Sequence, residues 1–340
     1  MMNLYRKAID SLDWGTQPAI VIGHKAPDGD SVMSALAYAY LMRQLGHDAV
    51  AFMAGRANNE TLFAAKAFCI ELPRVLTDES ALKDLNSVRM ILMDHSDYAQ
   101  SVELTRKCRI LQVIDHHGIG DICESKLIYG KYMPVGSTCS IVYSSFKELD
   151  VEITPDVAKI LLAGLLSDTL NLVKVTTTDV DRLIYKELLE ILASVWNVDA
   201  FAAQEKANGI YQGMVEAAHD FSSMTDEEIF NSDAKDYDWN GVKFRLGSLD
   251  WKDSASIDQF ADRMLQVMPS IMENAGAQMI FCRIGFEEKT CMAYYGSDES
   301  VVDIAEKAFG KSKCPGKIFS DRRLSRKLDV IPMLAKVLKP

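Results

Sequence analysis

Histidine and aspartate residues gather in four short strings in the first half of the chain. They lie at residues 24–30 (HKAPDGD), 94–95 (DH), 115–117 (DHH) and 167–168 (SD). Four of the six histidines belong to these strings, and each lies close to a carboxylate. Carboxylates and imidazoles without thiolates favour Mn²⁺, Mg²⁺ or Co²⁺ over a structural zinc site. The residue types therefore indicate a divalent metal site.

Each string alone also fits an ordinary turn or helix cap, because Asp is common in both. Four or five Asp gathered at one cleft would repel one another without cations, so the coincidence of the strings favours metal binding. Two ions about 3.5–4 Å apart can share a water molecule and lower its pKa. They can also stabilise both the attacking and the leaving oxygen of a phosphoryl transfer. His47 and His219 lie outside the strings, and we expect them to be structural or surface residues.

The strings follow segments that should form a parallel sheet. Apolar runs alternate with helical patterns, which predicts an α/β domain with a mostly parallel sheet flanked by helices. Ligands of such sheets bind beyond the carboxyl ends of the strands, where the polar strings fall. The expected elements are strands 19–22, 88–93 and 110–114, a helix from 31 to 45 with Asp30 or Ser31 as its N-cap, and a helix 156–166 after Pro155.

Strand-like and helical patterns in the second half of the chain predict a smaller α/β domain. We expect residues 1–196 to form a metal-binding catalytic domain, 197–212 a linker and 213–340 a substrate-binding domain. The elements expected in the last are strands 244–246, 278–284 and 291–295 and helices 256–275 and 301–309.

Length and charge narrow the class of protein. A chain of 340 residues suits two domains. A net charge of −11 argues against a general nucleic-acid partner. No run approaches the roughly 18 apolar residues of a membrane span, and seven scattered cysteines fit a reducing compartment. We therefore expect a cytoplasmic protein with no membrane partner. The segment 311–327 is locally basic, which fits either a solvated surface or a polyanion site.

The strings together resemble the DHH phosphoesterase superfamily and, within it, the manganese-dependent (family II) inorganic pyrophosphatases with a DHHA2-type second domain. The resemblance runs nearly from end to end. It is carried by residues 23–25, 27–28, 30–31, 94–95, 114–117, 134–138, 167–170, 233–235, 325–327 and 330–332.

This resemblance implies a role for each matching residue. The implied metal ligands are His24 and Asp28 for one ion, Asp30, His116 and Asp168 for the second, and Asp94 as the bridge between them. His117 would face the substrate and Asp115 would orient its neighbours. Lys235, Arg326 and Lys327 would hold the phosphates.

The implied reaction is hydrolysis of inorganic pyrophosphate to two phosphates by a hydroxide bridging two Mn²⁺ ions. Co²⁺ or Mg²⁺ could substitute, and a further Mg²⁺ would arrive with this small inorganic polyanion. A homodimer through the first domain is left open. Three departures from the family pattern bear on substrate identity: Gly29 in place of Thr, Gly118 in place of Arg, and residues 172–175 in place of a Phe-Lys-Ser-Pro-like stretch.

Three rival functions remain. An exopolyphosphatase would share the chemistry and act on longer chains. An oligonucleotide or cyclic-dinucleotide phosphodiesterase of the superfamily typically has a glycine-rich string ending in His, yet the last histidine here is His219. An inactive regulatory protein would be expected to lack one or more ligands, and all the expected positions are filled.

Overall fold

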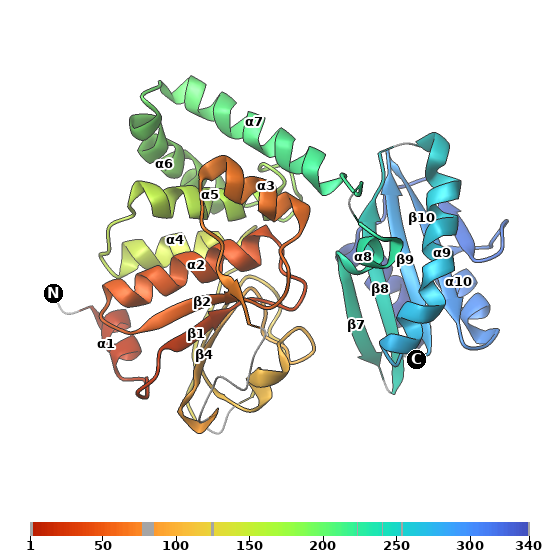
Figure 1. Ribbon diagram of the computed structural model, residues 1–340, viewed down its shortest axis with the longest axis horizontal. Coiled ribbons are helices and arrows are strands. Elements are labelled where there is room, and N and C mark those ends of the chain that lie inside the picture. Colours follow the sequence, from red (N-terminus) through yellow and green to blue (C-terminus); the bar gives the residue numbers. More distant parts are fainter. Residues whose placement is uncertain are drawn as a thin grey trace. The chain divides into compact units, whose positions relative to one another are not determined.

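The computed structural model describes residues 3–76, 85–123, 126–222, 224–239, 241–252 and 254–338. The chain divides into two compact units, Met1–Ala218 and His219–Pro340. Each unit contains one β-sheet with helices packed against it, which confirms the predicted α/β class (Figure 1). Among the described residues, none of the helices is both long and apolar enough to span a bilayer.

The first unit is built on a six-stranded sheet in the order β3-β2-β1-β4-β5-β6, with every neighbouring pair parallel. All residues of β1 and β4 are buried, as expected of central strands covered on both faces. The three strands predicted in this region are confirmed. The strands are β1 (Ala19–Ile22), β2 (Ala49–Met53), β3 (Arg74–Val75), β4 (Arg89–Met93), β5 (Arg109–Asp115) and β6 (Tyr129–Tyr132).

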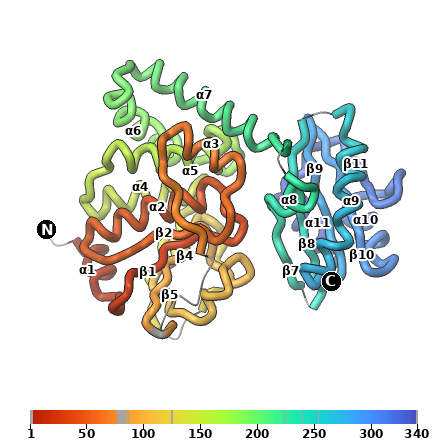
Figure 2. The backbone as a smooth tube through the Cα atoms, in the orientation of Figure 1, coloured from red at the N-terminus to blue at the C-terminus, as the bar shows by residue number. Residues whose placement is uncertain are grey.

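Helices cover one face of this sheet. α2 and α4 contact the strands. α5 packs on α2 and α4, and α6 and α7 lie further from the sheet (Figure 2). On the opposite face, Leu104 and Cys108 from the segment before β5 pack on β1, β4 and β5. The helices are α1 (Leu4–Asp10), α2 (Gly29–Gln44), α3 (Asn59–Phe68), α4 (Thr138–Glu148), α5 (Pro155–Thr169), α6 (Asp179–Trp196) and α7 (Ala200–Ala218).

The start of α2 differs from the prediction. Asp28, rather than Asp30 or Ser31, is the N-cap, because its extended backbone lets its side chain accept a hydrogen bond from Ser31 N at 3.0 Å. Asp30 therefore lies in the first helical turn and is fully buried.

The expected linker 197–212 lies largely within α7, which packs on α3 and α6 of the first unit.

The second unit has a five-stranded mixed sheet in the order β11-β10-β9-β8-β7, in which only β8 and β9 run parallel. α9 covers one face, and α10 and α11 cover the other. The three predicted strands and two predicted helices are confirmed. The elements are α8 (Asp226–Asn231), β7 (Ala234–Trp239), β8 (Val242–Asp250), α9 (Ile257–Asn274), β9 (Met279–Phe286), β10 (Lys289–Gly296), α10 (Ser300–Phe309), β11 (Lys317–Ser320), a π-helical turn η5 (Arg326–Val330) and α11 (Ile331–Leu338).

Candidate metal centre

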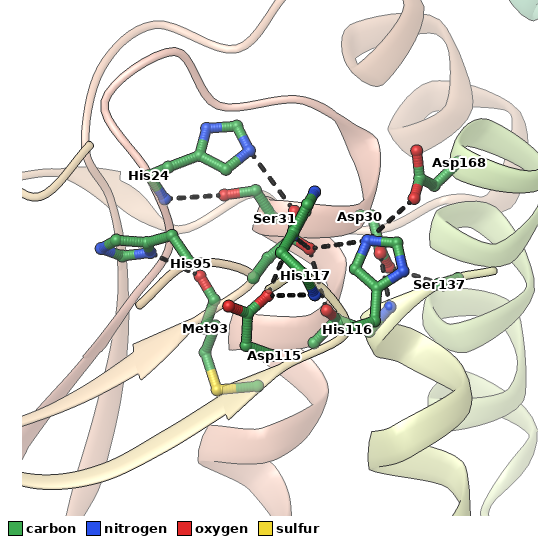
Figure 3. A network of polar contacts seen from close by, with 12 residues as sticks. His24, Asp30, Ser31, Met93, His95, Asp115, His116, His117, Ser137 and Asp168 are labelled. Atoms are coloured by element: carbon green, nitrogen blue, oxygen red, sulfur yellow. Dashed lines mark hydrogen bonds and ion pairs between the residues drawn. The ribbon is translucent and has the colours of Figure 1, made fainter. Parts of the chain in front are cut away.

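The candidate site lies where the strand order of the first sheet reverses. From β1 the chain proceeds to β2 and β3 on one side, and β4 then pairs with the other side of β1. Such a reversal leaves a crevice beyond the carboxyl ends of the two central strands. His24 follows β1 by two residues, Asp94 directly follows β4, and Asp115 ends β5. The side chains of His24 and Asp115 converge with Asp30 of α2 and Asp168 of α5 (Figure 3).

Asp94 lies at the centre of this cluster. Its carboxylate is 2% exposed, and its backbone is left-handed with φ 62°. Oδ2 lies 3.3 Å from His24 Nε2, whereas Oδ1 lies 3.4 Å from His116 Nε2 and 3.6 Å from His117 Nδ1. The two oxygens of one carboxylate thus face different histidines.

Around Asp94, the described residues form three groups able to hold a metal ion, in which one ligand atom per residue lies within 4.8 Å of the others. All six residues expected as ligands occur in these groups, and His117 joins them. The groups are His24, Asp28 and Asp94; Asp30, His116 and Asp168; and Asp94, His116 and His117.

His116 is oriented to act as a ligand. Its Nδ1 lies 2.9 Å from the Val135 carbonyl oxygen, which can only accept, so Nδ1 carries the proton. Nε2 then faces Asp168 Oδ2 at 3.1 Å. Both of these atoms are buried and make no hydrogen bond. Buried polar atoms without partners are costly, and a metal ion between them would satisfy both.

Asp30 is held by the N-terminus of α4. Its carboxylate accepts hydrogen bonds from Ser137 Oγ at 2.7 Å, Thr138 N at 2.6 Å and Cys139 N at 3.0 Å. The positive end of the helix dipole favours a carboxylate there. Even so, burial together with the charges of Asp94 and Asp168 raises the pKa of Asp30 to about 8.

The site retains protons when no cation neutralises it. Burial alone would lower the pKa of His116, but the close approach of Asp168 and the charges of Asp94 and Asp30 raise this pKa to about 10. Burial acts against the charge on Asp94, yet His24, His117 and His116 lower its pKa well below the usual value. A divalent ion bound to Asp30 and His116 must therefore displace protons.

Asp115 fixes the orientation of His117. Its Oδ1 accepts hydrogen bonds from the backbone N and from Nδ1 of His117, both at 2.9 Å. These bonds and the charge of His117 outweigh burial and lower the pKa of Asp115. The His117 side chain remains 26% exposed. A histidine held through Nδ1 can present Nε2 to a substrate.

His95 lies in a string with Asp94 but belongs to none of the three groups. Its ring is buried between the Met93 carbonyl and Ser101 Oγ, both at 2.9 Å from its nitrogens. Burial lowers its pKa to about 4. His95 is therefore a neutral core residue beside the site.

Comparisons with known proteins identify the family of this chain. The DHH family N-terminal domain matches residues 18–165, and the DHHA2 domain matches residues 212–337. The manganese-dependent inorganic pyrophosphatase of Methanothrix thermoacetophila is 34% identical over 322 residues, which cover 94% of this chain and 98% of the relative. The chain belongs to the manganese-dependent (family II) inorganic pyrophosphatases. The predicted family resemblance is confirmed.

Solved structures agree with membership of the family II pyrophosphatases. A crystal structure from Methanococcus jannaschii, assigned to this family, is 27% identical with a TM-score of 0.76 and covers 95% of this chain and 100% of that one. An exopolyphosphatase-related protein from Bacteroides fragilis is 14% identical with a TM-score of 0.51, covering 98% of this chain and 94% of that one. The second likeness shows a shared fold alone.

Two departures from the family II pyrophosphatase pattern have different steric settings. A Cβ on Gly29 would lie 2.6 Å from Ser167 Oγ and 2.7 Å from Ser167 Cβ, so a Thr would require Ser167 to move. A Cβ on Gly118 would meet nothing within 4 Å, so a side chain could start there without a clash at Cβ. Ser167 of α5 thus leaves no room for a side chain at position 29, whereas no neighbouring atom prevents a Cβ at position 118.

Two charged side chains close to the candidate metal ligands lie outside the four strings of His and Asp. Lys174 Nζ donates a hydrogen bond to Asp168 Oδ1. Glu60, in the first turn of α3, bonds with Ser167, and burial together with Asp28 and Asp168 raises its pKa to about 7. The sequence marked Lys174 only as part of the departure at 172–175, and nothing local marked Glu60.

In the second unit of this pyrophosphatase, the structure brings Arg326 to the string 233–235. Arg326 Nη1 lies 2.6 Å from Asp233 Oδ1 and 3.1 Å from the Asp233 carbonyl oxygen. Lys235 lies two residues further on, in β7, and Lys327 is exposed beside Arg326. Other cations of the basic segment pair with acids: Lys317 with Asp258 and Asp262, Arg322 with Asp329, and Arg323 with Asp250.

Proposed function

We propose that this protein hydrolyses inorganic pyrophosphate to two phosphate ions at a centre of two Mn²⁺ ions in its first unit. The proposal rests mainly on the two carboxylate oxygens of Asp94, which face different histidines: Oδ2 faces His24, and Oδ1 faces His116. A carboxylate with one oxygen toward each of two ligand groups suits a bridge between two ions. The manganese dependence named for the relatives supports the choice of metal.

Each ion would be held by one group. His24, Asp28 and Asp94 would hold one, and Asp30, His116, Asp168 and Asp94 the other. The buried His116 Nε2 and Asp168 Oδ2, which make no hydrogen bond, support this assignment. When bound, such ions supply Lewis acidity that lowers the pKa of water and offsets phosphate charge. Co²⁺ or Mg²⁺ could occupy the same oxygen and nitrogen ligands, and a further Mg²⁺ would enter with pyrophosphate.

The protein's own side chains would orient and neutralise the substrate. His117, held through Nδ1 by Asp115, would donate a hydrogen bond from Nε2 to a phosphate oxygen. Lys235, Arg326 and Lys327 would bind phosphoryl oxygens, and Arg is suited to bidentate contact with phosphate. The contact between Arg326 and Asp233 supports this role, because it fixes the guanidinium near Lys235. We propose residues 1–196 as the catalytic domain and 213–340 as the substrate-binding domain, connected through 197–212, most of which lies in helix α7.

We propose a homodimer through the first unit: β6 ends the sheet with one edge unpaired among the described strands, and Leu127 close by is 88% exposed.

We also propose a cytoplasmic location without nucleic-acid partners, which the cysteine thiols and the net charge of −11 support.

The test is a comparison of substrates and metals. Purified protein, freed of metal by chelation and reloaded with Mn²⁺ or Mg²⁺, is given pyrophosphate, tripolyphosphate, long-chain polyphosphate or a dinucleotide, and phosphate release is measured. We expect release from pyrophosphate to dominate and to be strongest after Mn²⁺ loading. Preference for long polyphosphate would replace the proposed substrate, and equal activity of chelated protein would exclude the metal centre.

A further inference from the structure

Lys174 places a positive charge directly against the candidate metal ligands. Its ammonium donates a hydrogen bond to Asp168 Oδ1, and its charge also acts on Asp28 and Asp30. The side chain is 28% exposed, so most of it is enclosed by the protein. An ammonium in such a position interacts more strongly with nearby charges than one on the open surface.

The backbone between Asp168 and Lys174 adopts an unfavourable conformation. Leu170, Asn171 and Leu172 are consecutive left-handed residues with φ of 51°, 53° and 69°. This region is disfavoured for residues that carry a Cβ, so three in succession require compensation from their surroundings.

Hydrogen bonds supply that compensation. Lys174 N donates to the Thr169 carbonyl at 2.9 Å, and Leu172 N donates to Thr169 Oγ1 at 3.1 Å. Asn171 Nδ2 donates to Asn208 Oδ1 of α7 at 3.1 Å. The chain therefore turns back sharply after α5, and the turn returns Lys174 to the carboxylate at the end of the same helix.

The two oxygens of Asp168 have different neighbours. Oδ1 accepts from Lys174, whereas Oδ2 faces His116 Nε2 at 3.1 Å and makes no hydrogen bond. An ion held by Asp30, His116 and Asp168 would use Oδ2. The ammonium and the ion would then lie on opposite oxygens of one carboxylate, close enough for their charges to repel.

We propose that Lys174 is a built-in counter-cation of the group Asp30, His116 and Asp168, which stabilises the metal-free site and weakens binding of the ion there. The inference rests on the metal centre of the proposed function. Before the ion binds, the ammonium offsets part of the carboxylate charge. After it binds, the same ammonium lies beside a divalent cation in a partly buried site, where repulsion is weakly screened. Both effects favour the metal-free state, so the ion is held less tightly and exchanges more readily.

The test measures metal affinity rather than activity. Lys174→Met keeps an unbranched side chain that is only one atom shorter and removes the charge, whereas Lys174→Arg keeps the charge. Lys159→Met is the matched control, because Lys159 pairs with Asp156 at the far end of α5. Metal-free proteins are titrated with Mn²⁺ by calorimetry, and free Mn²⁺ is followed by electron paramagnetic resonance.

We expect one of two Mn²⁺ sites to tighten on the order of tenfold or more in Lys174→Met, since a unit charge a few ångströms away is removed. Lys174→Arg and Lys159→Met should stay within about threefold of the unaltered protein. Metal-free Lys174→Met should also melt at a lower temperature, with excess Mn²⁺ reducing the difference.

The direction of the change separates this role from structural damage, because a damaged site binds metal more weakly. Unchanged or weaker Mn²⁺ binding by Lys174→Met would overturn the proposal for Lys174 while the metal centre stands. Failure of the unaltered protein to bind Mn²⁺ would instead overturn the metal centre, and this inference with it.

Discussion

Thr138 Oγ1 donates a 2.8 Å hydrogen bond to Asp94 Oδ1, joining the first turn of α4 to the carboxylate at the centre of the site across 44 residues of sequence. Both side chains are buried. Asp94 also has a left-handed backbone, so its direction depends on such support. Outer hydrogen bonds of this kind orient metal ligands and raise their affinity.

Replacing Thr138 should therefore weaken metal binding without removing a ligand. Thr138→Val keeps the shape and loses the donor, and we expect Mn²⁺ affinity to fall about tenfold to a hundredfold. Thr138→Ser keeps the hydroxyl and should stay close to the unaltered protein. Equilibrium dialysis against Mn²⁺ measures both. Equal affinity of the Val and Ser variants would show that this hydrogen bond does not matter.

Asp94→Asn tests the bridge. Asn tolerates a left-handed backbone, so the fold should persist, while the loss of charge should abolish binding of both ions and reduce phosphate release from pyrophosphate by at least about a thousandfold. Asp28→Asn changes only the group formed by His24, Asp28 and Asp94, so it should weaken the binding of one ion. Titration of both variants with Mn²⁺ gives the stoichiometry, and two retained sites in Asp94→Asn would refute the bridging role.

Arg326→Ala should impair substrate capture more than metal binding. The guanidinium contacts Asp233 at 2.6 Å and would supply a bidentate phosphate contact. We expect KM for pyrophosphate to rise about tenfold to a hundredfold, with Mn²⁺ stoichiometry unchanged. Arg322→Ala removes a 63% exposed cation of the same segment and serves as the control. A similar change in both variants would point to general local charge rather than to Arg326 itself.

Gly29 and Ser167 should be coupled through steric contact. Gly29→Ala would place a Cβ 2.6 Å from Ser167 Oγ, and we expect a loss of about 1–3 kcal/mol in the free energy of unfolding. Ser167→Gly removes the obstructing atoms, so the double variant should be more stable than the sum of the single changes. Urea unfolding of the four proteins measures the coupling, and simple additivity would contradict the contact.

The sequence predicts those site residues that follow local patterns. His24, Asp94 and Asp115 come at the ends of apolar runs, and parallel strands bring such ends to one edge of a sheet. The three central strands were placed within a residue or so for the same reason. The predicted N-cap of α2 is wrong because Asp28, Asp30 and Ser31 are all good caps, and only the backbone conformation decides between them.

Contacts between distant segments could not be predicted from the sequence. Thr138 reaches Asp94, and Glu60 reaches Ser167, through the packing of different helices around the site. Lys174 reaches Asp168 because three consecutive residues are left-handed, and two of them, Leu170 and Leu172, are of a type that rarely adopts this conformation. The residues that contact the candidate metal ligands from other parts of the fold therefore leave no local pattern in the sequence.

Glu60 should make the stability of the metal-free protein depend on pH. Burial first, and then Asp28 and Asp168, raise its pKa from 4.5 to about 7. Between these values the folded protein binds the proton that the unfolded chain releases, so the contribution of Glu60 to stability is complete below pH 4.5 and is lost as the pH rises through 7.

Glu60→Gln removes this dependence. At pH 8 we expect the metal-free variant to be more stable than the unaltered protein by up to about 3 kcal/mol, and at pH 4.5 to be nearly equal to it. Urea unfolding in the presence of a chelator measures the difference at both pH values. Lys174→Met should lose stability under the same conditions, because it removes a cation from the same cluster of carboxylates. A Gln variant that is destabilised at pH 8 would show that the Glu60 carboxylate is held by favourable contacts that outweigh its burial.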